Sequence, residues 1–201
     1  MNYSIYAEST PNPEVMKFVS NRMLADKSIE FLTIEDSLKI PMIHKIFSLP
    51  FVESVFLSTN FISIKKNEHA EWGEIILELR NFITQILNED EIQNYSEDII
   101  IEKKIATHDS KTKQKKYPAR KGETETEKDI INLLNEYIKP AVEGDGGAIE
   151  LESYTEGTVR VILKGACSGC PSSTATLKHG IESLLIQKLG DKIKNVVAIN
   201  G

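Results

Sequence analysis

Alternating apolar and polar positions in the first hundred residues predict an antiparallel sheet with helices packed on it. Two neighbouring strand-like runs are separated by Ser58-Thr59-Asn60, a spacing that is typical of a hairpin. Helical spacing begins at Pro41, which suits a first helical position, and returns from Trp72 to Leu87 as an amphipathic pattern. The predicted strands are 3–7, 15–19, 29–34, 51–57 and 61–65.

The last part of the chain shows a second, shorter pattern of apolar positions. Apolar residues at helical spacing from Ile130 to Ile138 predict a helix that Lys139-Pro140 should end, because proline interrupts helical hydrogen bonding. Two alternating strands, a helix that starts at Pro171 and a final strand follow. The predicted strands are 148–154, 158–163 and 196–199. The resulting order is α-β-β-α-β.

A basic, polar segment separates the two patterns. Residues 102–121 carry eight Lys and Arg against two Asp and Glu, whereas the parts before and after it are both acidic. The segment contains few residues that could enter a core, so we expect a flexible tether. The fold class is therefore α+β, with two small domains, 1–101 and 127–201, joined by a flexible basic linker, 102–126. We expect no nucleic-acid binding, because the parts on either side are acidic and no aromatic residue stands among the lysines from Lys111 to Lys116 to stack on bases.

Composition narrows the class of protein further. Hydrophobic residues make up 40% of the 201 residues and charged residues 27%, as in globular proteins, and no apolar run is long enough to cross a membrane. The sequence begins without a signal- or transit-peptide pattern and has two cysteines, so we expect a cytoplasmic protein without membrane association.

The two cysteines carry the candidate chemistry. Cys167 and Cys170 stand three positions apart, where the strand 158–163 turns into the helix that begins at Pro171. Proline at the first helical position places Cys170 near the N-cap, where unpaired amides and the helix dipole favour a thiolate or an anionic metal centre. Gly165 and Gly169 leave room for an inorganic group close to the backbone.

Three chemistries fit such a pair. A thioredoxin-like dithiol oxidoreductase also has its cysteines between a strand and a helix, but it normally has a larger sheet and a proline between the cysteines. A zinc knuckle needs two more ligands, and His179 is more than two helical turns beyond Cys170. The third is a metal or cluster shared by two subunits, each of which supplies Cys167 and Cys170. Such a centre would be labile, which suits transfer.

The sequence around these cysteines resembles a known family. Residues 127–201 are similar to the NifU C-terminal, or Nfu, domain, and the first domain is similar to the Nfu N-terminal domain. The matching motifs are Ile138-Lys139-Pro140-Ala141-Val142, Asp145-Gly146-Gly147, Leu163 to Ser173, Thr176 to Glu182, Thr10-Pro11-Asn12-Pro13 and Phe47 to Phe56. The resemblance covers all of the chain except the basic linker.

The resemblance implies an iron–sulfur cluster scaffold or carrier rather than an enzyme. Such proteins hold a [4Fe–4S] cluster across a homodimer and pass it to apo-proteins, so Cys167 and Cys170 would be the cluster ligands; whether a [2Fe–2S] form also binds stays open. The implied partners are a second copy of the chain, apo iron–sulfur client proteins and upstream assembly factors. For Asp145-Gly146-Gly147, we weigh a tight turn with positive φ against a loop that shapes the cluster pocket.

Overall fold

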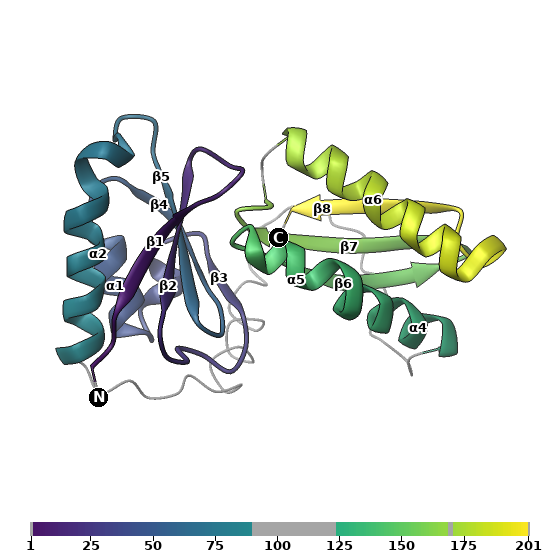
Figure 1. Cartoon of the computed structure of the whole chain (residues 1–201), viewed down its shortest axis with the longest axis horizontal. Helices are drawn as coiled ribbons and strands as arrows, with labels where there is room; N and C mark the ends of the chain where they lie inside the picture. The colour runs from purple at the N-terminus through teal and green to yellow at the C-terminus, as the bar shows by residue number, and fades with distance from the viewer. Residues whose placement is uncertain (1, 90–123, 169–170, 201) are drawn as a thin grey trace.

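The computed structural model describes residues 2–89, 124–168 and 171–200 (Figure 1). In the first domain, five strands form one antiparallel sheet in the order β1-β2-β5-β4-β3. Their bounds are β1 Ile5–Ser9, β2 Val15–Ser20, β3 Ile29–Phe31, β4 Val52–Leu57 and β5 Phe61–Lys66. The five predicted strands and the β4–β5 hairpin are therefore confirmed.

Strand β3 is shorter than the predicted run to Ile34. The Asp36 carboxylate accepts hydrogen bonds of 3.1 Å from the backbone N–H groups of Leu32 and Thr33, which turns the chain away from the sheet. A short 3-10 helix, η1 Glu35–Ser37, follows directly. A local side-chain bond thus competes here with continued strand pairing.

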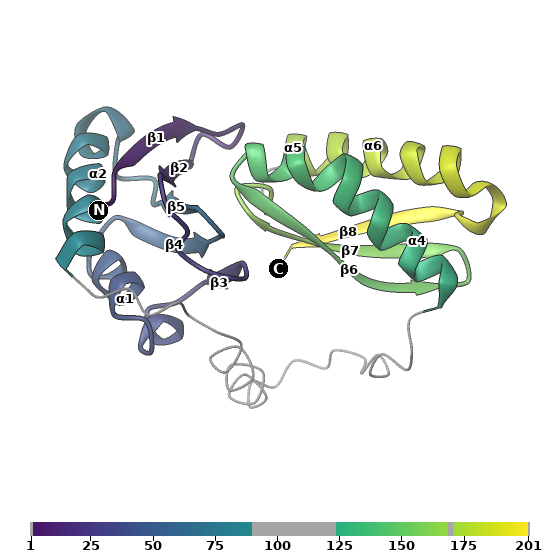
Figure 2. The same ribbon diagram turned by 60° about the horizontal axis from the view of Figure 1, so that its bottom comes forward.

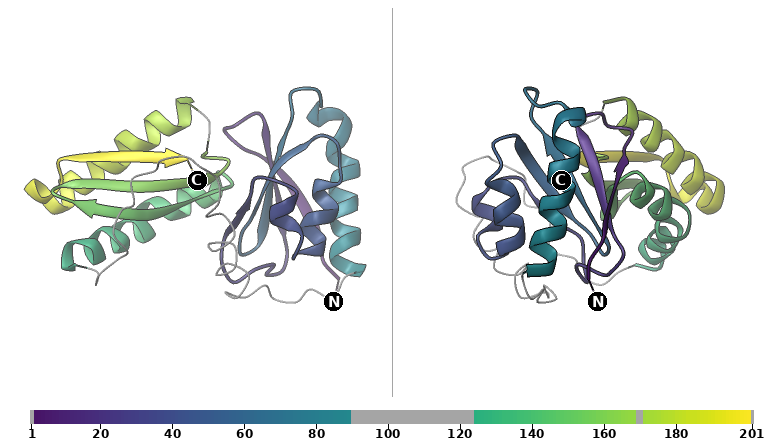
Figure 3. Two further views of the ribbon diagram at one scale, coloured as in Figure 1. Left: turned by 180° about the vertical axis from the view of Figure 1, so that it is seen from behind. Right: turned by 60° about the vertical axis from the view of Figure 1, so that its left-hand side comes forward.

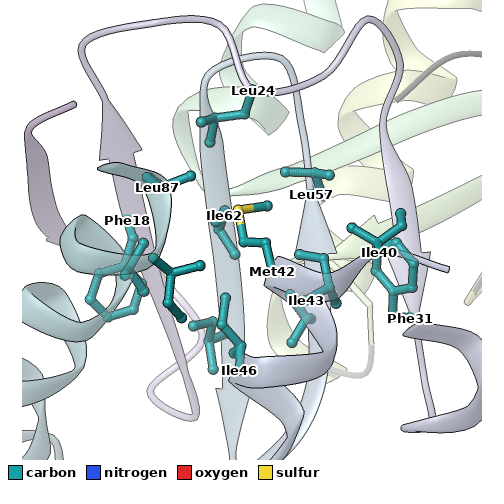
Figure 4. Packing of buried hydrophobic residues seen from close by; sticks show 14 of the residues in the cluster. Phe18, Leu24, Phe31, Ile40, Met42, Ile43, Ile46, Leu57, Ile62 and Leu87 are labelled. Atoms are coloured by element: carbon teal, nitrogen blue, oxygen red, sulfur yellow. The ribbon is translucent and has the colours of Figure 1, made fainter. Parts of the chain in front are cut away.

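Two helices cover one face of this sheet. They are α1, Pro41–Phe47, and α2, Trp72–Glu89, and both confirm the predicted helices. Their buried side chains pack with alternate residues of the strands, including Phe18 and Ile62, as Figure 4 shows. Successive side chains of a strand point to opposite faces of the sheet, so Lys17 and Ser63 lie on the other face, which neither helix covers.

The second domain has the predicted α-β-β-α-β order. Strands β6, Gly147–Thr155, and β7, Thr158–Gly165, form an antiparallel hairpin. Helix α6, Pro171–Leu189, and a 3-10 turn, η4 Gly190–Lys192, then lead to β8, Asn195–Asn200, which pairs in parallel with β7. The helices of this domain lie on one face of its three-stranded sheet (Figure 2).

The prediction that Lys139-Pro140 ends the helix is wrong. Helix α4, Glu125–Leu133, continues through a π-helical stretch, η3 Leu134–Ile138, into α5, Lys139–Gly144. In the π-helical stretch the Lys139 N–H donates to the Leu134 carbonyl, five residues back. Pro140 then lies in the first turn of α5, where its missing N–H costs no intrahelical bond.

The start of α4 is fixed by a capping box. The Thr124 hydroxyl accepts from the Glu127 N–H, and the Glu127 carboxylate accepts from the Thr124 N–H at 2.7 Å. Residues 102–123 of the predicted linker lie outside the described residues. The boundaries 1–101, 102–126 and 127–201 therefore stay predictions.

The second domain lies against the face of the first sheet that α1 and α2 leave uncovered. The first sheet stands between its own helices and the glycine-rich end of the second domain (Figures 1 and 3). This end contains the last residue of α5, Gly144, the first residue of β6, Gly147, and the last residue of β7, Gly165. In the part of the chain that the structure describes, no helix is long and apolar enough to cross a membrane.

Candidate functional site

Strand β7 ends in the turn that holds the first candidate cysteine. Gly165 has a φ of +65°, in the left-handed region, and the Ser168 N–H donates to the Gly165 carbonyl at 3.0 Å, which closes the turn. Cys167 lies inside this turn, and its residue is only 6% exposed. Cys170 lies outside the described residues, so its predicted place near the N-cap of α6 stays a prediction. The start of α6 at Pro171 is confirmed.

The Gly146-Gly147 segment lies directly beside this turn. Gly146 has a φ of +82°, and its carbonyl accepts a 3.2 Å hydrogen bond from the Ala166 N–H. Gly147 pairs with Gly165, and a Cβ at Gly147 would lie 2.8 Å from the Cys167 sulfur. Both expectations for Asp145-Gly146-Gly147 are therefore met in part. Gly146 makes a turn with positive φ, and Gly147 packs against the cysteine turn.

Polar side chains of the first domain reach the backbone of both loops. The Ser63 hydroxyl donates to the Gly146 carbonyl at 2.6 Å, and the Gly165 N–H donates to the Glu30 carboxylate at 2.8 Å. Two further hydrogen bonds run from the first domain to the second, from Lys17 Nζ to the Gly144 carbonyl at 3.1 Å and from Asn12 Nδ2 to the Ala166 carbonyl at 3.4 Å.

An apolar contact accompanies these hydrogen bonds. Phe56 and Phe61, on the uncovered sheet face, are buried with Ala148 of β6, and their ring centroids are 6.0 Å apart. A Cβ at Gly165 would lie 2.8 Å from the Phe56 ring. The absence of side chains at Gly146 and Gly165 therefore lets the backbone approach the sheet closely.

Sequence reasoning missed this contribution of the first domain. One signal was present in β2, where Val15 and Val19 are apolar although they lie on the face opposite the core. The alternation of apolar and polar residues along this strand is therefore incomplete. A second was Phe56 and Phe61, large aromatics at positions where a solvent-facing sheet is usually polar. Neither signal identifies what covers the face.

Among residues 2–89, 124–168 and 171–200, no group of three or more His, Cys, Asp and Glu side chains could hold a metal ion. Cys167 is the candidate ligand that these residues provide, and its sulfur lies beside Gly147, where a Cβ would come within 2.8 Å of it. A thiolate can bind a soft metal or an iron–sulfur cluster.

Comparison with known proteins identifies the family. Residues 5–90 match the model of the scaffold protein Nfu/NifU N terminal, and residues 130–197 match the NifU-like domain. The chain is 30% identical over 207 residues to the mitochondrial NifU-like protein of Saccharomyces cerevisiae, covering 95% of this chain and 78% of that protein. The chain therefore belongs to the Nfu/NifU family of iron–sulfur cluster scaffold proteins, as the sequence motifs predicted.

Other relatives are longer than this chain. The mitochondrial NFU1 iron-sulfur cluster scaffold homolog of Drosophila willistoni is 32% identical over 190 residues, which cover 90% of this chain and 58% of that protein. A solution structure of the NifU-like protein from Saccharomyces cerevisiae is 28% identical, covers 45% of this chain and 82% of that one, and has a TM-score of 0.40.

Proposed function

We propose that this chain carries an iron–sulfur cluster on Cys167 and Cys170 and transfers it to apo-proteins. The observation that supports this function most directly is the match of residues 130–197 to the NifU-like domain, since this range includes both cysteines. The relatives whose names describe iron–sulfur cluster scaffolds support the same function. A carrier of this kind does not catalyse a reaction of its own.

The ligand count supports a cluster shared between two copies of the chain. A [4Fe–4S] cluster takes four ligands, usually cysteine thiolates, and this chain has two cysteines. Two copies would supply the full set.

Transfer would occur by exchange of ligands. Thiolates of an apo-protein replace Cys167 and Cys170 one at a time, and the cluster leaves with its new ligands. A site that is completed only in a dimer suits this exchange, because separation of the two copies removes half of the ligands. We assign recognition of clients and upstream assembly factors to the first domain, within residues 1–101.

Anaerobic reconstitution of the full chain with iron and sulfide tests this function. We expect a brown dimer with about four irons, measured by visible absorption, by iron and sulfide analysis and by light scattering. About two irons per dimer would indicate the [2Fe–2S] form instead. Cys167→Ser should abolish loading, whereas Ser168→Ala, a matched change at the neighbouring position, should leave it intact.

The same preparation separates the carrier from its strongest alternative. A thioredoxin-like dithiol oxidoreductase would stay colourless and monomeric and would reduce insulin disulfides with Cys167 and Cys170 as the redox pair. That result would exclude the carrier function. Removal of residues 1–101 should slow transfer to a client without preventing loading, and unchanged transfer would exclude the role of the first domain.

We propose the cytoplasm as the compartment in which the chain works. The sequence predicts a cytoplasmic protein, whereas the names of the Drosophila willistoni and Saccharomyces cerevisiae relatives place those proteins in mitochondria. Cell fractionation with an antibody against the chain distinguishes the two locations.

A further inference from the structure

We propose that the first domain is a removable cover for the cysteine turn, so that the chain has a closed form without cluster and an open form with cluster. The docking surface is the uncovered sheet face, defined here by Lys17, Glu30, Phe56, Phe61 and Ser63. Its occupant is the glycine-rich edge of the second domain of the same chain, defined by Gly144, Gly146, Ala148, Gly165 and Ala166. The docking follows from the contacts alone, whereas its effect on cluster loading rests on the proposed function.

The first step concerns access to the sulfur. Cys167 is 6% exposed and belongs to the buried core of the second domain, yet a cluster ligand has to meet iron that is also bound by a second copy of the chain. The first domain makes hydrogen bonds to residues on the N-terminal side of this cysteine, Gly165 and Ala166, and to Gly146, which bonds to the same turn. A second copy could approach this turn only from directions that the first domain leaves open.

The second step concerns the chemistry of the contact. The docking surface offers a cation and a carboxylate, and both contact backbone groups of the glycine-rich edge. Lys17 is 8% exposed and its ammonium also lies 4.9 Å from the Phe61 ring centroid and 3.3 Å from the Glu8 carboxylate. Charged groups lose hydration when they are buried, so separation of the domains restores water to Lys17 and Glu30.

The third step compares this contact with a permanent core. The apolar part of the interface is small, namely Phe56, Phe61 and Ala148 with Val19 packed beside them. The two domains have separate cores on either side of it. Small interfaces of mixed polarity between domains of one chain open reversibly, as transient complexes do. The contact therefore suits a cover that leaves and returns.

The closed and open forms link docking to cluster loading. If only the open form binds cluster with a second copy, each chain's apparent affinity for the cluster is its intrinsic affinity multiplied by the fraction of chains that are open. Linkage is reciprocal, so a bound cluster must in turn favour separated domains. A client or assembly factor that binds the docking surface would promote opening.

The first test measures docking in the full chain without iron. Glu30→Lys removes the acceptor for the Gly165 N–H, and Glu78→Lys makes the same charge change on an exposed position of α2, which packs on the other face of the sheet. We measure small-angle X-ray scattering and the rate at which iodoacetamide alkylates Cys167, assigned by fragment mass spectra. Circular dichroism verifies that each variant is folded.

We expect the wild type and Glu78→Lys to scatter as docked domains and to react slowly at Cys167. Glu30→Lys should expand and react about tenfold faster, the factor that corresponds to one lost hydrogen bond to a charged group. Ser63→Arg, which puts a long side chain where Ser63 meets Gly146, provides a second variant if Glu30→Lys is poorly folded.

Three results would overturn the proposal. They are a wild type whose scattering requires separated domains, folded Glu30→Lys and Ser63→Arg variants that both stay docked, and an undocked variant whose Cys167 reacts at the wild-type rate. Reconstitution is then a separate measurement. Undocked variants should load cluster faster than the wild type. Equal rates would refute the inference that domain docking opposes cluster loading. If no form of the chain loads cluster, the proposed function fails while the docking result stands.

Discussion

Replacing Gly147 by alanine adds a methyl group where β6 lies against the cysteine turn. The new Cβ would lie 2.6 Å from the Lys164 carbonyl oxygen and 2.8 Å from the Cys167 sulfur. Gly147 has an ordinary negative φ, so the backbone itself tolerates alanine and the effect is steric. The substitution therefore tests how tightly the turn is packed.

The two close contacts differ in how easily they can relax. The Cys167 side chain can rotate about its Cα–Cβ bond, but the Lys164 carbonyl belongs to β7, whose Lys164 is paired with Ala148. Relief of that contact has to bend the hairpin. Overpacking of this kind costs about 1 to 3 kcal/mol, and we expect a loss in the upper part of that range.

Urea unfolding of the full chain measures this loss. The single tryptophan, Trp72, lies in α2, where its indole N–H donates to the Pro13 carbonyl at 2.9 Å, so its fluorescence reports on the first domain. Far-ultraviolet circular dichroism reports on both domains. At an m-value of about 1 kcal/mol/M, a loss of about 2 to 3 kcal/mol lowers the midpoint of the second domain by about 2 to 3 M.

Gly144→Ala is the matched control, because a Cβ at Gly144 meets no atom within 4 Å. We expect it to leave the stability of the second domain unchanged or raise it slightly, while Gly147→Ala lowers the circular dichroism midpoint and leaves the Trp72 transition nearly in place. Equal midpoints for the two variants would refute the packing argument. Reconstitution of Gly147→Ala should also show weaker cluster loading than Gly144→Ala.

Three further substitutions test local features of the second domain by the same urea titration. Gly180→Ala, in α6 with no atom within 4 Å of the new Cβ, should stabilise by about 1 kcal/mol through helix propensity, and a loss would reveal an undetected contact. Thr124→Ala removes the capping box of α4 and should cost about 1 kcal/mol, whereas no change would mean that this helix end is frayed in solution. Ile181→Ala, at a fully buried position, should cost about 2 to 5 kcal/mol, and a value below 1 would contradict its place in the core.

The sequence predicts the elements well because their signals are local. The apolar spacing from Trp72 to Leu87 gives α2 almost to its end at Glu89, and Pro41 marks the first residue of α1. The two-residue turn Glu156-Gly157 joins β6 to β7 with positive φ at both residues, as a hairpin of this kind requires.

The errors and omissions depend on interactions that no local pattern encodes. Pro140 normally ends a helix, but a π-helical stretch before it shifts the hydrogen bonding so that the proline falls in a new first turn. The order of strands in the first sheet depends on tertiary pairing. The Cys167 position could be predicted from its motif, whereas the contacts of Ser63 and Glu30 to the Gly146 and Gly165 backbone link residues more than 80 positions apart.

In the four hydrogen bonds described above between the two domains, every side-chain group belongs to the first domain. On one side they use the side chains of Asn12, Lys17, Glu30 and Ser63, and on the other they use carbonyl and amide groups of the main chain. Every residue type except proline presents these main-chain groups, so amino-acid identity on the second domain matters mainly where bulk is forbidden. A saturation mutagenesis map of this contact should therefore be one-sided. Tolerance in the first domain should depend on chemical type, and in the second domain on size, most severely at Gly146 and Gly165.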